Sequence, residues 1–218
     1  MSITISTRKP RGQGAERRGE ILAAAKRLFL EEGFEHATMR RIAAEIGVSA
    51  AALYGYFPDK EAMLHAIAEA TFGELLASLR ESQQAEASSL ERFKAGLRAY
   101  VAFGVAHPDE YRLTFLAKMI NAEKATSVCS REIEDADRSF AILEQGVADL
   151  MTAGLVVPGD TLAAAEAVWA CLHGTTALVL DQPAHVQTPP ARLIETVIAL
   201  ILGGLASPLA GASDEAHG

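Results

Sequence analysis

Apolar residues recur three and four positions apart along most of the chain, which is the spacing of amphipathic helices. Residues 16–33 follow this pattern until Gly33 interrupts it. Similar patterns follow Thr38, Ser49 and Asp59, which are residue types that cap helix N-termini. The sequence therefore predicts four consecutive helices up to about residue 80.

The rest of the chain continues in the same way. Ser88 and Glu91 have the spacing of a capping box, which predicts a fifth helix. Four more helices are expected: one over 109–119, one that contains Ile133 and ends at Gly154, one over 161–180 and one from 191 to about 205. No segment reads as a strand, so we expect an all-α protein of about nine helices.

Charge is distributed unevenly over this acidic chain, whose formal net charge is −8. Residues 1–60 carry ten Lys or Arg and seven Asp or Glu, whereas residues 61–218 carry ten and 21. A net charge of −8 argues against a protein that coats nucleic acid or an anionic membrane with its whole surface. We expect only the mildly basic head, residues 1–60, to meet an anionic partner.

The sequence also predicts a cytoplasmic protein without a membrane segment. Cys129 and Cys171 have no partner at metal-binding or disulfide-framework spacing, which is typical of a reducing compartment. Residues 1–14 lack the apolar core of a signal peptide and are expected to form a flexible basic arm. The strongly apolar run 196–206 is shorter than the about 20 residues that a membrane helix needs.

The segment around Gly47 has the features of a helix-turn-helix. Gly47 separates two short helices at a point where a positive φ costs little. Val48 and Leu53 are expected to anchor the second helix. Its remaining side chains are small, so its backbone could approach the floor of a major groove, where alanine methyl groups meet thymine methyl groups.

Tyrosine hydroxyls and basic side chains around this helix can hold phosphates. For the tyrosines the alternative is ordinary packing, and for the arginines it is a solvated helix face. The expected DNA contacts are Arg40, Arg41, Ser49, Ala50, Ala51, Ala52, Tyr54, Tyr56 and Lys60.

The run "TMRRIAAEIGVSAAALYGYFPDKEAML" resembles the helix-turn-helix of the tetracycline-repressor (TetR) family of bacterial transcriptional regulators. The resemblance covers about residues 15–75 and adds Thr38 to the expected DNA contacts. The sequence departs from the family at Ala51, where members often have glycine or proline, and at Ala52, where they often have threonine. The matching positions are Thr38, Arg40, Ile42, Ala43, Gly47, Val48, Ser49, Leu53, Tyr54, Tyr56, Phe57, Lys60 and Glu61.

The resemblance implies an N-terminal three-helix DNA-binding domain at residues 15–75, joined by a linker helix to a ligand-binding and dimerisation domain at 76–208. Residues 209–218 would form a disordered tail. We expect the fourth helix to be the only mechanical link between the two domains.

The segment "AVWACLHGTTALVL" looks like the subgroup whose C-terminal domain carries a Trp–His–Gly signature, here Trp169, His173 and Gly174. By this resemblance the last two helices form a dimer interface, and both are too apolar to face water. We also expect Cys171 to be a buried small hydrophobe. The expected interface residues are Val168, Leu172, Leu178, Ile194, Ile198, Ile201 and Leu202.

An effector pocket is expected among the helices between the linker and the dimer face, with walls that suit a hydrophobic small molecule. For His173, a satisfied buried histidine is favoured over a ligand contact. For Cys129, a redox role is the lesser alternative. The expected lining residues are Phe72, Phe103, Tyr111, Phe115, Trp169 and His173.

No motif of a catalytic site, cofactor site or metal site occurs in the sequence, so we expect neither an enzyme nor a cofactor. The sequence predicts a homodimeric, sequence-specific DNA-binding regulator, a repressor that a hydrophobic ligand releases from a palindromic operator. The alternative is an all-α adaptor that binds proteins and does not bind DNA.

Overall fold

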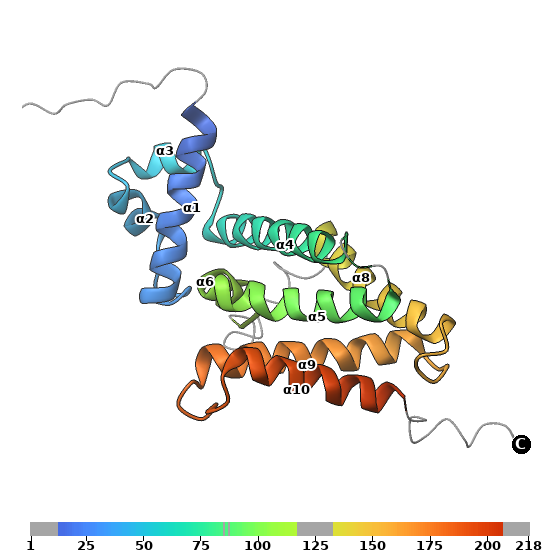
Figure 1. The fold of residues 1–218 in the computed structure, drawn as a ribbon. Helices are drawn as coiled ribbons and strands as arrows, with labels where there is room; N and C mark the ends of the chain where they lie inside the picture. The colour runs from blue at the N-terminus through green and yellow to red at the C-terminus, as the bar shows by residue number, and fades with distance from the viewer. Residues whose placement is uncertain (1–12, 85, 87, 117–132, 207–218) are drawn as a thin grey trace, which may run out of the picture.

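The computed structural model describes residues 13–84, 86, 88–116 and 133–206 (Figure 1). The expected arm (except residues 13 and 14), the loop at 121–127, Cys129 and the expected C-terminal tail lie outside these residues. Within them every regular element is a helix, as the sequence predicts.

The head comprises three helices, α1 (Gln13–Glu31), α2 (Met39–Glu45) and α3 (Ala50–Tyr54). The body comprises α4 (Lys60–Gln84), α5 (Ser89–Ala106), α6 (Pro108–Tyr111), the π-helical turn η1 (Arg112–Leu116), α8 (Glu134–Thr152), α9 (Thr161–Asp181) and α10 (Pro190–Leu205). Over its described residues, 109–116, the expected sixth helix is thus one α-helical turn that continues into a π-helix, and residues 117–119 lie outside the described part of the chain. In Figure 1, α5, α9 and α10 lie side by side along the body, with α4 and α8 beside α5.

Side-chain caps and glycines set most of the helix ends. Ser49, Ser88 and Asp160 each accept a hydrogen bond from the backbone N–H three residues on, at 3.0 to 3.2 Å. These bonds satisfy donors that the first helical turn leaves unpaired. Gly33 and Gly154 follow α1 and α8 with positive φ, a conformation that lets the chain leave a helix.

The described residues form two hydrophobic cores. The head core surrounds Leu28, Ile42 and Leu53, each at most 1% exposed. The body core surrounds Val147 and Leu150, which are fully buried. The periodicity that predicts each helix therefore also identifies much of its buried face.

Helix α4 contributes residues to both cores, but it is not the only link between head and body. Leu113 of η1 is 4% exposed and belongs to the head core, and Lys26 of α1 forms an ion pair with Glu110 of α6. The expectation of a single mechanical link is therefore wrong. It missed this contact because residues 110 and 113 are far from the head in sequence.

The expected dimer interface needs correction in most of its members. Val168, Leu172, Ile194, Ile198 and Ile201 are 2 to 8% exposed because they pack into the core of their own protomer. Leu202 is partly buried against the same core. Of the expected set, Leu178 is truly exposed, at 52%.

The outward face of α9 and α10 carries other residues. It is made mostly of small side chains, with Leu178 and Leu200 as its large apolar members, and it includes Cys171, which is exposed and not buried as expected. The exposed positions are Ala163, Ala167, Ala170, Cys171 and Leu178 on α9, and Thr196, Ala199, Leu200 and Gly203 on α10, and Gly174 on α9 is partly exposed beside them. These residues define the outer α9–α10 face.

Among the described helices, α9 alone has the length and composition that would suffice to cross a membrane. It packs against α5, α8 and α10, and core helices of soluble proteins satisfy the same criterion. Its apolar character is accounted for by this packing on one side and by the small-residue face on the other.

Close packing between α5 and α9 yields a stability prediction. A Cβ at Gly104 would lie 2.4 Å from Cγ2 of Thr176 and 3.0 Å from Cδ2 of Tyr111. We expect Gly104→Ala to lower the free energy of unfolding by about 1–3 kcal/mol, because the buried neighbours have little room to move. Thermal unfolding measures the effect. The control is Gly19→Ala on α1, where a Cβ meets nothing within 4 Å and stability should rise by about 0.4–1 kcal/mol. A Gly104→Ala protein as stable as the wild type would contradict this packing.

Candidate nucleic-acid interface and ligand cavity

Helices α2 and α3 form a helix-turn-helix whose turn is fixed by local hydrogen bonds. Gly47 has φ +67°, and the N–H of Val48 donates to the carbonyl of Ala43 at 2.9 Å. Thr38 and Ser49 cap the two helices through their side-chain oxygens. Leu53 is fully buried, as expected of the residue that anchors α3 to the head.

The opposite side of α3 faces solvent. Tyr54 and Tyr56 are 55% and 42% exposed, and Ser49, Ala51 and Ala52 are exposed beside them. Arg40 on α2 is also exposed. The structure thus brings most of the expected DNA contacts to the surface around α3, where none of their side chains is needed for the head core.

Two members of the expected set are placed differently. Ala50 is half-buried against the head core. Thr38 is exposed, but its hydroxyl oxygen accepts from the N–H of Arg41 at 3.2 Å. Both positions help to set the position of α2 and α3, and a DNA contact by either remains a prediction.

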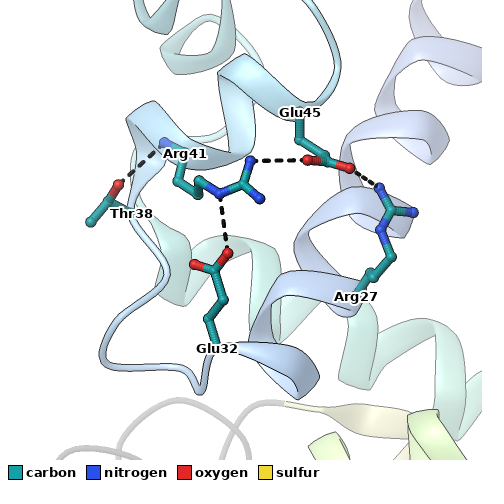
Figure 2. A network of polar contacts seen from close by, with 5 residues as sticks. All are labelled: Arg27, Glu32, Thr38, Arg41 and Glu45. Atoms are coloured by element: carbon teal, nitrogen blue, oxygen red, sulfur yellow. Dashed lines mark hydrogen bonds and ion pairs between the residues drawn. The ribbon is translucent and has the colours of Figure 1, made fainter.

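Arg41 takes part in a network of ion pairs between α1 and α2 (Figure 2). Its Nε donates to Glu32 at 3.1 Å and its Nη1 donates to Glu45 at 3.0 Å, while Arg27 donates to the other oxygen of Glu45 at 2.7 Å. The bonds to Glu32 and Glu45 raise the pKa of Arg41, and those from Arg27 and Arg41 lower the pKa of Glu45. The network fixes α2 on α1, a role for Arg41 that does not require DNA.

Lys60 also has partners within the head. Its Nζ donates to the carbonyl of Phe34 at 2.6 Å and to that of Glu35 at 3.3 Å, and it lies 4.3 Å from the centroid of the Phe34 ring. These contacts join the start of α4 to the connection between α1 and α2. A phosphate contact by Lys60 remains a prediction, and two of its three donors already have acceptors.

The body contains a cavity of about 340 Å³. Of the residues expected to line an effector pocket, Phe72, Phe115, Trp169 and His173 do so. Phe103 and Tyr111 do not: Phe103 stacks on His107 with ring centroids 4.6 Å apart, and Tyr111 is 1% exposed behind the cavity wall. The other lining residues are Leu75, Leu79, Gln83, Phe93, Gly96, Leu97, Tyr100, Thr114, Ala136, Asp137, Ser139, Phe140, Ile142, Leu143 and Leu172.

Tyr111 supports the cavity wall through hydrogen bonds. Its hydroxyl lies 3.3 Å from that of Tyr100 and 2.8 Å from Nδ1 of His173. Burial raises the pKa of both tyrosines and lowers the pKa of His173, so all three groups are neutral near pH 7. His173 is therefore a histidine with a hydrogen-bond partner inside the protein, and it also lines the cavity, where a ligand could contact it.

Sequence reasoning missed several lining residues, including Tyr100, Thr114 and Phe140. Tyr100 and Phe140 could be identified as apolar positions on their helices but not as cavity walls. Thr114 had no sequence signal, because its position depends on the π-helical geometry of η1.

Comparisons with known proteins agree with this architecture. Residues 21–67 match the model of bacterial regulatory proteins of the tetR family, and residues 93–201, half of the chain, match the tetracyclin repressor-like C-terminal domain.

Individual proteins resemble the chain at low sequence identity. The HTH-type transcriptional activator FasR of Mycolicibacterium smegmatis is 28% identical over 65% of this chain and 68% of its own. Other curated relatives match over about half of their length or less. A solved structure of a protein of unknown function from Rhodococcus sp. RHA1 has a TM-score of 0.74, with 28% identity over 92% of this chain and all of that chain. The fatty acid degradation regulator FadR of Bacillus halodurans shares the fold, with a TM-score of 0.71 and 21% identity over 91% of this chain and 98% of that chain.

The helix-turn-helix, the all-helical body and both family matches lead to one conclusion. The chain belongs to the tetR family of bacterial regulatory proteins and is a DNA-binding transcriptional regulator.

Proposed function

We propose that the protein binds a palindromic operator as a homodimer and represses transcription until a small hydrophobic ligand releases it. One observation carries the DNA-binding part. On α3, Leu53 is fully buried while Ser49, Ala51, Ala52 and Tyr54 face solvent, so the helix is held from behind and presents a slim outer surface. Such a surface can enter a major groove, and the flanking tyrosines can reach phosphates. A protein-binding adaptor would not need it.

The cavity supports the ligand part of the proposal. Its volume lies at the lower end of the range for small-molecule sites, about 300–1,000 Å³, and its walls are mainly apolar. Trp169 and His173 both line it, and with Gly174 they make up the Trp–His–Gly signature, which supports a place in that subgroup. FasR is named a transcriptional activator, so relatives of this chain do not all repress transcription. We propose repression because it is the commoner action in the family.

The connection between cavity and head supports the release mechanism. Phe115 of η1 lines the cavity, whereas Leu113 of the same turn is part of the head core. A ligand that shifts η1 would therefore alter the packing of the head and the spacing of the two heads in a dimer. A coupling free energy of about 1–3 kcal/mol would be enough to change operator affinity substantially.

The outer α9–α10 face supports homodimerisation in a cytoplasmic protein. Its small residues would let two pairs of helices approach closely, and its exposed leucines would lose contact with water. Two such recognition surfaces would have to lie about 34–36 Å apart, or a multiple of this, to read a palindrome on one side of B-DNA.

The experiment that tests the proposed function is selection of duplexes from a random library by the purified full chain. We expect a palindromic consensus whose affinity falls steeply as the salt concentration rises. Arg40→Ala should reduce discrimination between the consensus and random DNA by about 1–3 kcal/mol without changing the melting temperature. Lys60→Ala is the contrasting variant, since losing its bonds to the carbonyls of Phe34 and Glu35 should lower the melting temperature.

Failure to enrich any sequence would contradict the DNA-binding role of the α3 surface. Equal losses on consensus and random DNA for Arg40→Ala would make Arg40 a phosphate contact and not a reader of bases.

The dimer proposal is tested by two neighbouring residues on α10. Leu200 is 71% exposed on the outer face, whereas Ile201 is 8% exposed in the protomer core. We expect Leu200→Asp to give folded monomers that bind the operator weakly, because a charge would enter the interface. Ile201→Asp should instead unfold the body. Sedimentation equilibrium and far-UV circular dichroism separate the two results, and a Leu200→Asp protein that remains dimeric would exclude this face.

A further inference from the structure

One buried hydroxyl in the cavity wall has no hydrogen-bond partner among the residues that the structure describes. Among the described residues, the buried polar side chains are those of Thr71, Thr114, Ser139, Thr175 and Thr176. Four of them donate to the carbonyl four residues earlier, at 2.7 to 2.9 Å. Thr114, 3% exposed, makes no such bond, and its hydroxyl bonds to no other part of the described chain.

The exception coincides with an unusual backbone. Thr114 lies in η1, the π-helical turn, whereas the other four residues lie in α-helices, where a hydroxyl reaches the carbonyl of residue i−4. A buried hydroxyl without a partner costs free energy, and such a group in a folded protein calls for an explanation, such as backbone strain, a function or a bound molecule. Thr114 lines the cavity, and a rotation of its side chain about χ1 would turn the hydroxyl, whose oxygen is itself buried, toward a molecule inside it.

Other polar groups lie at the same end of the cavity. Phe115, the neighbour of Thr114, packs against Tyr100 and His173 with ring centroids 6.5 and 5.8 Å away. Tyr100 and His173 both line the cavity and are joined behind its wall through Tyr111. Nδ1 of His173 is occupied by Tyr111, and Nε2 bonds to no described residue. This end can therefore offer a bound molecule more than one hydrogen bond.

None of the described lining residues is a lysine or an arginine. The one carboxylate among them is Asp137, and burial keeps His173 neutral by lowering its pKa. A carboxylate or phosphate in the cavity would lose its hydration without gaining a cation, which is strongly unfavourable. The walls therefore discriminate against anions.

We propose that the cavity binds an uncharged, mainly apolar molecule through one hydroxyl or carbonyl group, which forms a hydrogen bond with the Thr114 hydroxyl. This proposal rests on the ligand-responsive function proposed above and specifies its ligand. The polar group lies at the η1 end, and the apolar part of the molecule extends away from η1 along lining residues such as Leu79 and Phe93. A chain of about ten carbons is a suitable size for a cavity in this volume range.

An adjoining cleft would suit the competing class of ligand, a fatty acid or another organic anion. It shares Gln83, Phe93 and Ile142 with the cavity and also contains Arg80, Arg92 and Arg138. Arg138 is paired with Glu134 and Asp135, and Arg92 lies 3.9 Å from Asp149. Acidic neighbours of two of the three arginines weaken the cleft as a site for the head of a fatty acid, so we favour the neutral ligand and make the anion one arm of the test.

The test uses the purified full chain at pH 8 with decan-1-ol, decan-2-one and decanoate as probes. Trp169 lines the cavity and is the single tryptophan of the chain, so its fluorescence reports binding directly. We expect the alcohol and the ketone to bind, and decanoate to bind at least about 100-fold more weakly. Decanoate binding as tightly as decan-1-ol would overturn the proposal in favour of the arginine-lined cleft.

Thr114→Val supplies the second readout. It should weaken decan-1-ol binding about three- to tenfold, because one hydrogen bond is lost. It should also raise the melting temperature of the free protein by about 2–4 °C, because a buried unpaired hydroxyl is removed. A merely structural threonine would not combine these two effects.

Thr71→Val is the matched control. Its hydroxyl is buried and already bonds to the carbonyl of Ile67 at 2.8 Å, and it does not line the cavity. It should leave decan-1-ol binding unchanged and should not raise the melting temperature. Unchanged decan-1-ol binding in Thr114→Val would overturn the assignment of Thr114, while binding by the wild type would still support a ligand cavity. Failure of every probe to bind would contradict the ligand-responsive function itself, and this proposal with it.

Discussion

The two hydrophobic cores meet where the ring of Phe72 packs edge-on against Phe115, with centroids 5.1 Å apart. Phe72 lies on α4 and contacts both cores, and Phe115 lies on η1 and faces the cavity. Within η1, Leu113 packs into the head while Thr114 and Phe115 form cavity wall. Packed interiors respond to small displacements by switching between arrangements, because they have little free volume. We therefore propose that this junction makes the state of the cavity and the position of the head depend on each other.

Local sequence signals accounted for most of the fold. Capping residues such as Ser49 and Ser88, and glycines such as Gly47, act within a few residues of their own position, so they could be recognised without a structure. The helix-turn-helix followed from the same signals. The second contact between head and body could not be predicted, because Lys26 and Glu110 are brought together by the tertiary fold alone.

Sites were harder to predict than helices, because tertiary contacts decide which side chains face the core, the surface or the cavity. Periodicity identifies an apolar helix, but α9 and α10 are apolar on several sides, so it could not show that Ile201 faces the protomer core and Leu200 faces outward. Charge likewise suggested a DNA contact for Arg41, whereas the structure pairs it with Glu32 and Glu45. The role proposed for Thr114 depends on a π-helical turn that no sequence pattern predicted.

The junction at Phe72 and Phe115 can be tested without knowing the ligand, by measuring backbone hydrogen exchange of the full chain with and without a duplex that it selects. Exchange at η1, Arg112–Leu116, reports on the cavity wall, and exchange at α10 serves as an internal reference. We expect operator binding to slow exchange at η1, although η1 is not part of the proposed DNA surface, and to leave exchange in the middle of α10 unchanged. Identical exchange at η1 in the free and operator-bound protein would contradict a coupling between head and cavity through this turn.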